Sequence, residues 1–463
     1  MIRHLLRRND AKIVFLVMDG LGDIRTKDFP RTALESAHKP HLDALAREGL
    51  CGRSMPISYG VTPGSGPAHF ALFGYDPLAP ENDVGRGVLE VLGTGFSLEK
   101  DDVAIRGNFA TIDAEGVLTD RRAGRIPHEE CIRLTAKLQA GIEEIGGAKV
   151  TIMPVREYRF GIVLRGKGLS PEVEETDPQL TGKKPLAPVA RVKEAKRTAE
   201  IMAEIIARCD TILADEKKAN TVLMRGISRM PHVEPLRERT LLSPAAIAAY
   251  PLYRGVAKLC GMELIDTGFS VKEEFETLRA IYGKGFDFFF VHVKKTDSYG
   301  EDGNLEGKIN IIEEVDRSLP VILDLKPEVI VVTGDHSTPC ALKAHSWHPV
   351  PFLIHSAVCG RDNAGSFSES ECDKGGLGIF PAVKIMELAL DSDRRIRRKS
   401  RPFRSDRLDP QFPKPAMTSN KRPGRRWRRP TRAVRFRPTI PTSASSTTMT
   451  TTRTRSWSPR TEP

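Results

Sequence analysis

The 463-residue sequence lacks the features of several protein classes. Its seven cysteines form no Cys-x-x-Cys pair, which favours reduced thiols in a cytoplasmic protein over the disulfide framework of a secreted one. No apolar run approaches the roughly 20 residues that span a membrane. The short apolar run 13–18 ends in Asp-Gly, so it predicts a strand and not a signal peptide. No internal repeat of about 20–50 residues is present. We therefore expect a globular enzyme or binding protein with no membrane association.

Positive charge is concentrated at one end of the chain. Residues 394–463 contain 21 Lys and Arg against three Asp and Glu. Because the whole chain carries +11 and this segment carries +18, residues 1–393 carry −7. A nucleic-acid surface on the folded part is therefore not expected, and nucleic acid or acidic partners could bind only the tail.

The C-terminal segment 392–463 is predicted to be disordered. After Leu390 the hydrophobic periodicity disappears and the composition turns to Arg, Pro, Ser and Thr, which cannot bury enough apolar surface to offset ordering entropy. One hypothesis is a basic arm that binds nucleic acid. We prefer a frame-shifted gene end, because the change is sudden and Trp427 and Trp457 stand among arginines without pattern. An intact reading frame through Pro463 on resequencing would exclude the artefact.

Three apolar runs, 12–19, 286–293 and 328–336, each end in residues that can bind metals. Continuous β-branched and aromatic runs indicate strands buried on both faces, as in parallel sheets covered by helices. Helices are predicted between them at 33–48, 243–260 and 305–323. The fold class is therefore α/β, with a mostly parallel sheet flanked by helices.

The region between residues 80 and 249 has a different character. It contains Arg-rich loops, short alternating strands at 149–155 and 161–165, and a long helix around 192–207. We predict a smaller inserted α/β domain over 80–249, within a discontinuous catalytic domain formed by 1–79 and 250–391.

Potential metal ligands follow the predicted strands, where parallel sheets place their ligand sites. They are Asp19, Asp297, Asp335 and His336, with His345 and His348 downstream. Each alone has another explanation, such as a turn, a helix cap or a surface residue. Together they suffice for two divalent ions, and mixed carboxylate and imidazole ligands suit Mn²⁺ or Zn²⁺ better than Ca²⁺. The sequence has no His-Glu-x-x-His run, which argues against a zinc peptidase.

Ser65 is the candidate nucleophile. It stands in Thr62-Pro-Gly-Ser-Gly-Pro67, which predicts a turn followed by a helix whose N-terminus attracts phosphate. A serine at a helix start is usually a structural cap. The nearby metal ligands favour a phosphate-accepting nucleophile in a two-metal phosphoryl-transfer enzyme.

At this point the sequence resembles a known family. Six segments, 17–20, 62–67, 85–96, 102–108, 333–339 and 344–351, are similar to the cofactor-independent phosphoglycerate mutases. The similarity is to the archaeal-type branch of this family, within the alkaline phosphatase superfamily, and it covers about residues 10–390 without reaching the tail.

The resemblance implies an isomerase that interconverts 3-phosphoglycerate and 2-phosphoglycerate in glycolysis and gluconeogenesis, through a phosphoserine and without bisphosphoglycerate. It implies two divalent ions, expected to be Mn²⁺, with Zn²⁺, Co²⁺ or Mg²⁺ as alternatives. One ion would be held by Asp19, Ser65, Asp335 and His336. The other would be held by Asp297, His345 and the residue four after Asp297, which is normally histidine and here is Glu301. Glu301 either binds as a harder oxygen ligand, favouring Mn²⁺ or Mg²⁺, or faces water.

Arginines are expected to hold the anionic substrate, since they contact carboxylate and phosphate in bidentate fashion. The predicted substrate-binding residues are Asp120, Arg121, Arg125, Arg86, Arg106 and Arg225. The first three are favoured because they share a compact loop, Tyr158-Arg159 is a weaker candidate, and His69 and His292 are predicted to be structural. Two alternative functions remain: a metal-dependent phosphatase or other phosphomutase of the superfamily, and a catalytically idle regulator that binds nucleic acid through the tail. The sequence leaves the oligomeric state open.

Overall fold

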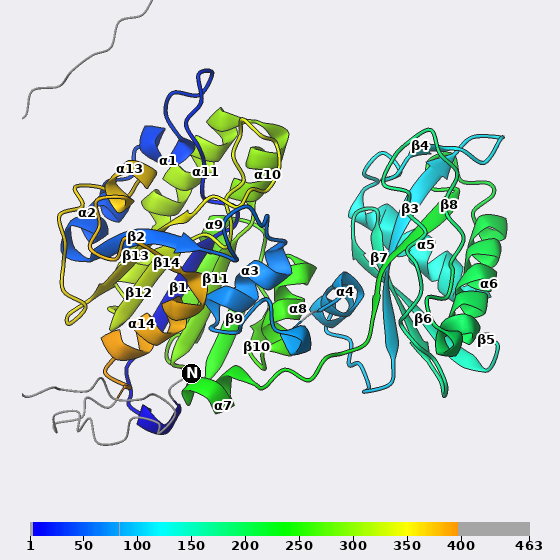
Figure 1. The fold of residues 1–463 in the computed structure, drawn as a ribbon, viewed down its shortest axis with the longest axis horizontal. Coiled ribbons are helices and arrows are strands. Elements are labelled where there is room, and N and C mark those ends of the chain that lie inside the picture. The colour runs from blue at the N-terminus through cyan, green and yellow to red at the C-terminus, as the bar shows by residue number, and fades with distance from the viewer. Residues whose placement is uncertain (1–2, 83, 397–463) are drawn as a thin grey trace, which may run out of the picture. The chain divides into compact units, whose positions relative to one another are not determined.

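The computed structural model describes residues 3–82 and 84–396, which form two sheets and the helices around them (Figure 1). The first is an eight-stranded sheet and the second is a separate six-stranded sheet. In the part of the chain that is described, no helix is both long and apolar enough to cross a membrane. The predicted tail segment 397–463 lies outside the described residues.

The large sheet is mostly parallel, as predicted. Its strand order is β10 (Glu263–Ile265), β9 (Pro244–Ala248), β11 (Phe288–Val293), β1 (Ile13–Met18), β12 (Val329–Thr333), β13 (Val350–Ser356), β2 (Leu50–Met55) and β14 (Ile379–Pro381). Only β13 is antiparallel to its neighbours within this sheet.

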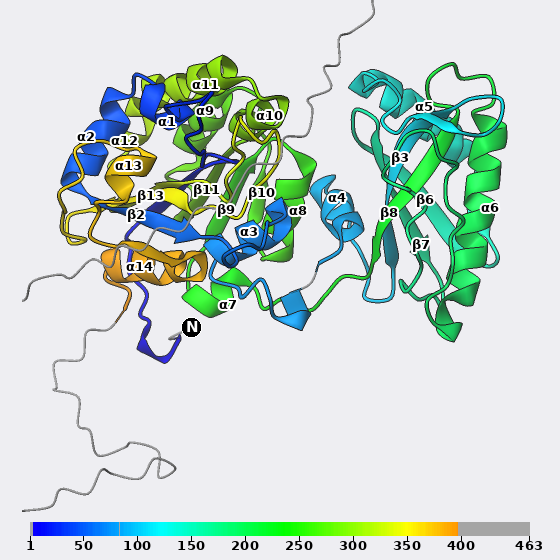
Figure 2. The same cartoon turned by 45° about the horizontal axis from the view of Figure 1, so that its top comes forward.

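Helices cover both faces of the large sheet (Figure 2). Along β1, Val14, Leu16 and Met18 join the apolar cluster on one face, whereas the alternate residues Ile13, Phe15 and Val17 join the cluster on the other. The first face is covered by α1 (Ala33–Ser36), α2 (Pro40–Glu48), α9 (Val271–Ile281), α11 (Leu305–Ser318) and α12 (Pro320–Leu323). The second is covered by α3 (Ser65–Leu72), α7 (Leu236–Thr240), α8 (Pro251–Leu259) and α14 (Ile385–Ser392). Burial on both faces explains why the central strands are continuously apolar.

Helix α4 (Arg86–Gly93) packs directly on α8, and glycines allow the close approach. A Cβ atom at Gly93 would overlap the carbonyl oxygen of Pro251, and one at Gly255 would overlap that of Leu89. The two helix backbones are therefore in contact. Since α4 carries Arg86 at its first position, this contact fixes that residue relative to α8.

The second sheet is antiparallel and has its own apolar core. Its strands are β4 (Leu118–Asp120), β3 (Val103–Ile112), β7 (Arg159–Arg165), β6 (Ala148–Arg156) and β5 (Glu144–Ile145), with β8 (Thr221–Ser228) pairing with β3. Its helices are α5 (His128–Gly141) and α6 (Lys196–Ile212). Short elements elsewhere are α10 (Lys295–Asp302), α13 (Glu369–Cys372) and 3-10 turns at Arg3–Leu5, Pro80–Asn82, Lys193–Ala195 and Ala382–Lys384.

Several predicted helices differ from the structure. The helix predicted at 33–48 is divided into α1 and α2, because Pro40 begins a new helix. The one at 305–323 divides at Pro320 for the same reason. The prediction over 243–260 is wrong in its first half, where Pro244–Ala248 form β9 between β10 and β11. Sheet pairing there overrides the helical preference of alanine. The helix predicted at 192–207 begins and ends later, at Lys196–Ile212.

The sheets and the packed residues bear on two of the predicted domain boundaries. Strand β9 belongs to the large sheet, so the chain returns to that sheet before residue 249, and the antiparallel sheet is built from residues 103–228. The predicted tail begins at residue 392, yet Asp393 and Arg395 are buried. Arg395 is fully buried and hydrogen-bonds Asp287, Asp393 and the carbonyl oxygens of Asn9 and Ala11.

Candidate active site

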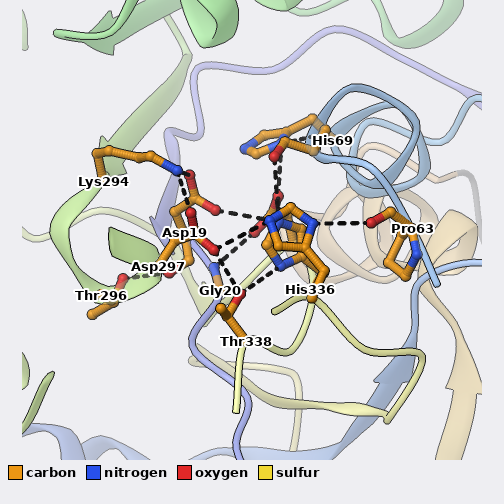
Figure 3. Close-up of polar contacts among 12 residues, drawn as sticks. Asp19, Gly20, Pro63, His69, Lys294, Thr296, Asp297, His336 and Thr338 are labelled. Atoms are coloured by element: carbon orange, nitrogen blue, oxygen red, sulfur yellow. Dashed lines mark hydrogen bonds and ion pairs between the residues drawn. The ribbon is translucent and has the colours of Figure 1, made fainter. Parts of the chain in front are cut away.

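The carboxyl ends of three adjacent strands assemble the candidate site. In the parallel register, Met18 of β1 lies beside Val293 of β11, and Val17 lies beside Thr333 of β12. The residues that follow these strands therefore emerge at one edge of the sheet. Asp19, Asp297 and His336 consequently point toward one another (Figure 3).

Ser65 lies at the first position of α3, with Gly64 as the N-cap residue. Its Oγ is 3.3 Å from His336 Nε2. His69, one turn later, donates from Nδ1 to the Ser65 carbonyl oxygen at 2.8 Å and lies 3.2 Å from Asp335 Oδ2. Helix α3 thus begins where a helix start was predicted, and the Ser65 side chain faces the potential metal ligands.

The first group of potential ligands consists of Asp19, Asp335 and His336, all buried. His336 Nε2 lies 3.2 Å from Asp335 Oδ2 and 3.5 Å from Asp19 Oδ1. Within the described residues, these two carboxylate oxygens are buried without a hydrogen-bond partner. Buried carboxylate oxygens without donors are expensive unless a cation satisfies them, so this group fits a divalent ion.

The second group consists of Asp297, His336 and His345. His345 Nε2 is 3.4 Å from Asp297 Oδ1, and its Nδ1 is 3.1 Å from the Pro63 carbonyl oxygen. Burial alone would lower the pKa of His345, but Asp297 outweighs it and raises this pKa to about 9. Glu301 Oε1 lies 3.9 Å from His345 Nε2, and the Glu301 side chain is 55% exposed. Glu301 thus borders this group from the solvent side.

Lys294 is a site residue that the sequence analysis missed. Its Nζ donates to Asp19 Oδ2 at 3.0 Å and to Asp297 Oδ2 at 2.5 Å, so it joins carboxylates of both groups. Burial would raise the pKa of Asp19, but Lys294 and the neighbouring imidazoles outweigh it and hold this pKa well below its usual value. Lys294 directly follows the run 286–293, and its position at that strand end was the available signal.

The two histidines predicted as structural are buried, and each contacts a carboxylate of the first group of potential ligands. His292 Nε2 lies 3.4 Å from Asp19 Oδ2, and its ring stacks on Tyr253 with ring centroids 3.8 Å apart. His69 contacts Asp335 as described above. Both therefore help to hold the carboxylates in place. His348 lies apart from both ligand groups and stacks on Trp347.

A cavity of about 470 Å³ opens beside Ser65 and is rich in arginine. Its lining includes the predicted Arg86, Arg106, Arg121, Arg125 and Arg225. Arg122, Arg159 and Tyr158 line it as well. The weaker candidate pair Tyr158-Arg159 thus reaches the same cavity as the favoured loop.

Acidic partners orient several of these arginines. Arg121 makes a bidentate contact with Asp177, with distances of 2.8 and 2.7 Å. Arg225 Nη1 lies 3.3 Å from the same carboxylate. Arg106 Nη1 is 3.7 Å from buried Glu90. Burial lowers the pKa of Arg106, which marks a cation held in a poorly solvated part of the cavity wall.

Asp120 differs from the other predicted substrate residues because it does not line the cavity. Its carboxylate accepts from the backbone N–H groups of Arg122 and Gly124, each at 2.7 Å. Ala123, Gly124 and Arg125 all have positive φ, so this short loop needs such support. Asp120 therefore shapes the loop that presents Arg121 and Arg125.

The comparisons with known proteins agree on one family. The family model described as 2,3-bisphosphoglycerate-independent phosphoglycerate mutase matches residues 46–219. A protein of Aquifex aeolicus named as a probable enzyme of this kind is 47% identical over 405 residues, covering 86% of this chain and 98% of that protein. A solved structure from Pyrococcus horikoshii has a TM-score of 0.71 at 29% identity and covers 86% of this chain and all of that one. The cofactor-independent phosphoglycerate mutase of Thermoplasma acidophilum has a TM-score of 0.59 at 27% identity, with 82% and 100% covered. Because it is 47% identical to that Aquifex aeolicus protein over nearly its whole length, the chain belongs to the 2,3-bisphosphoglycerate-independent phosphoglycerate mutase family.

Proposed function

We propose that this protein interconverts 3-phosphoglycerate and 2-phosphoglycerate in glycolysis and gluconeogenesis, without 2,3-bisphosphoglycerate. The observation that carries the proposal is the position of Ser65, whose Oγ faces His336 at 3.3 Å beside a cavity lined by arginines. The family relationship supports the same activity. We place the reaction in the cytoplasm, where the substrates of glycolysis are found.

The proposed reaction proceeds through phosphoserine. Ser65 Oγ attacks the phosphorus of 3-phosphoglycerate, the bond from phosphorus to the 3-oxygen breaks, and the serine proton ends on the released 3-hydroxyl. The 2-hydroxyl of the same glycerate then attacks the phosphoserine. The bond from phosphorus to Ser65 breaks, and the proton of the 2-hydroxyl returns to the serine. Atoms and protons balance over the two steps.

The two ligand groups are proposed to hold divalent ions, with Mn²⁺ preferred and Zn²⁺, Co²⁺ or Mg²⁺ as alternatives. The proposed ligands are Asp19, Ser65, Asp335 and His336 for one ion and Asp297, His345 and Glu301 for the other. Such ions would lower the pKa of the Ser65 hydroxyl and neutralise phosphoryl oxygens. For Glu301, replacement by histidine should shift relative metal affinity from Mn²⁺ toward Zn²⁺ or Co²⁺. Competition of each metal with a chelating dye measures this shift.

The arginines are proposed to retain glycerate while Ser65 carries the phosphoryl group. Glycerate keeps its carboxylate throughout the reaction. Asp177 holds the Arg121 guanidinium by a bidentate contact, so this guanidinium is a rigid donor for the glycerate carboxylate. Loss of glycerate at this stage would leave phosphoserine to water, and the enzyme would become a phosphatase. Retention of glycerate thus separates the proposed mutase from the phosphatase alternative.

The test is conversion of 3-phosphoglycerate by purified protein with Mn²⁺ and no bisphosphoglycerate. We expect 2-phosphoglycerate as the product, and glycerate plus inorganic phosphate as the only products would replace the mutase with a phosphatase. Ser65→Ala should abolish both conversion and ³²P incorporation into protein. Ser58→Ala, at an exposed position in the same loop, is the matched control and should retain both.

A further inference from the structure

One buried hydroxyl lies between ligands of the two candidate metal groups. Thr338 Oγ1 is 2.6 Å from Asp297 Oδ1 and 3.1 Å from His336 Nδ1 (Figure 3). Asp297 belongs to the second group, whereas His336 belongs to both. Thr338 is fully buried, so water does not compete for these contacts.

The chemistry of the three groups fixes the direction of both hydrogen bonds. A threonine hydroxyl has one hydrogen, and an ionised carboxylate can only accept, so Thr338 donates to Asp297. The threonine oxygen then accepts from His336, which must carry its proton on Nδ1. A neutral imidazole has only one N–H, so the lone pair is left on Nε2.

The free nitrogen of His336 faces the other candidate ligands. His336 Nε2 lies 3.2 Å from Asp335 Oδ2, 3.5 Å from Asp19 Oδ1 and 3.3 Å from Ser65 Oγ. This is the tautomer that a metal ion requires, because a protonated nitrogen cannot coordinate.

The surrounding backbone is arranged to hold Thr338 in this position. A Cβ atom at Gly20, where φ is +60°, would overlap Thr338 Oγ1, and one at Gly300 would overlap the Thr338 backbone. The buried ammonium of Lys308 donates to the carbonyl oxygens of Thr338 at 2.9 Å and of Gly22 at 3.2 Å. The two glycines thus leave the space that Thr338 occupies, and the buried lysine binds its backbone carbonyl oxygen.

We propose that Thr338 is a positioning residue that selects the metal-binding tautomer of His336 and orients Asp297, and so sets the affinity for divalent ions. The inference rests on the proposed function only in taking these residues as metal ligands. Replacement of groups that orient metal ligands typically lowers metal affinity by about 10–100-fold.

The test compares Thr338→Val, which keeps the shape and removes the hydroxyl, with Thr338→Ser, which keeps the hydroxyl. Mn²⁺ affinity is measured without substrate by competition with a fluorescent chelator. We expect a loss of about tenfold or more for Thr338→Val and less than about threefold for Thr338→Ser. At saturating Mn²⁺, KM for 3-phosphoglycerate should be unchanged in both, because Thr338 lies outside the cavity lining.

A second variant covers the case in which Thr338→Val does not fold. Gly300→Ala removes no polar group but displaces Thr338, and it should also weaken Mn²⁺ binding about tenfold or more. Folded Thr338→Val with wild-type affinity would overturn the proposal. A Thr338→Ser variant as weak as Thr338→Val would overturn it too, as would wild-type affinity in Gly300→Ala. Because no substrate is present, the outcome is independent of whether the wild-type protein is a mutase.

Discussion

Replacing Lys294 by methionine should destabilise the protein strongly when metal is absent. Lys294 Nζ lies 3.0 Å from Asp19 Oδ2 and 2.5 Å from Asp297 Oδ2, and its side chain is only 17% exposed. Methionine has a similar length but no charge. The variant therefore leaves two buried carboxylates without their shared cation.

The size of the effect follows from these contacts. A pair of unit charges 3.0 Å apart interacts by about 5 kcal/mol at an effective dielectric constant of about 20. Removing one partner of a buried pair costs about 3–5 kcal/mol, because the remaining charge stays desolvated. We expect the free energy of unfolding of Lys294→Met to fall by about that amount in metal-free buffer. Lys294→Arg retains the charge and should lose less.

Urea unfolding followed by circular dichroism, with EDTA or with Mn²⁺, measures both states. Metal at about 100 times its Kd stabilises a protein by about 2.7 kcal/mol. Mn²⁺ should stabilise Lys294→Met more than the wild type, since the ion no longer meets repulsion from the lysine. The reasoning is refuted if Lys294→Met is as stable as the wild type in EDTA.

Three further changes test other parts of the structure. Arg121→Lys loses the bidentate contact with Asp177, so KM for 3-phosphoglycerate should rise about tenfold or more in steady-state assays. An unchanged KM would place the substrate elsewhere. Burial raises the pKa of Glu274 from 4.5 to about 9. The protonated form is favoured in the folded state, so this group's contribution to stability is present below pH 4.5 and is lost as pH rises toward 9. In urea unfolding, the free energy of unfolding of Glu274→Gln relative to the wild type should therefore be higher at pH 8 than at pH 5. A relative free energy that is the same at both pH values would contradict this. Gly255→Ala places a methyl group against the backbone of α4 and should lower the unfolding free energy by about 1–3 kcal/mol, whereas Gly283→Ala should not, because its added Cβ would meet open space.

The central strands could be predicted because their burial leaves a direct trace in the sequence. Strands covered on both faces must be apolar at every position, and this marks β1, β11 and β12 together with the polar residues that follow them. The convergence of Asp19, Asp297 and Asp335 follows from that pattern, since parallel strands present their carboxyl ends at one edge.

Other features depend on contacts that a single sequence does not display. Pro244–Ala248 has the composition of a helix, and it is a strand because it pairs with β10 and β11. Lys294 gains its role from lying between Asp19 and Asp297, which are 278 positions apart in the chain. Asp120 was predicted to meet substrate, but the distinction between touching a ligand and supporting a loop requires coordinates.

The burial of Arg395 limits where a shift of reading frame can lie in the gene. Its guanidinium meets carboxylates and carbonyl oxygens of four other residues, a set of partners that an arbitrary codon would not supply. Any shift of reading frame should therefore lie downstream of the codon for Ile396. A shortened gene for expression should stop after that codon as well, because a chain ending at residue 391 would leave Asp287 without the buried arginine that pairs with it.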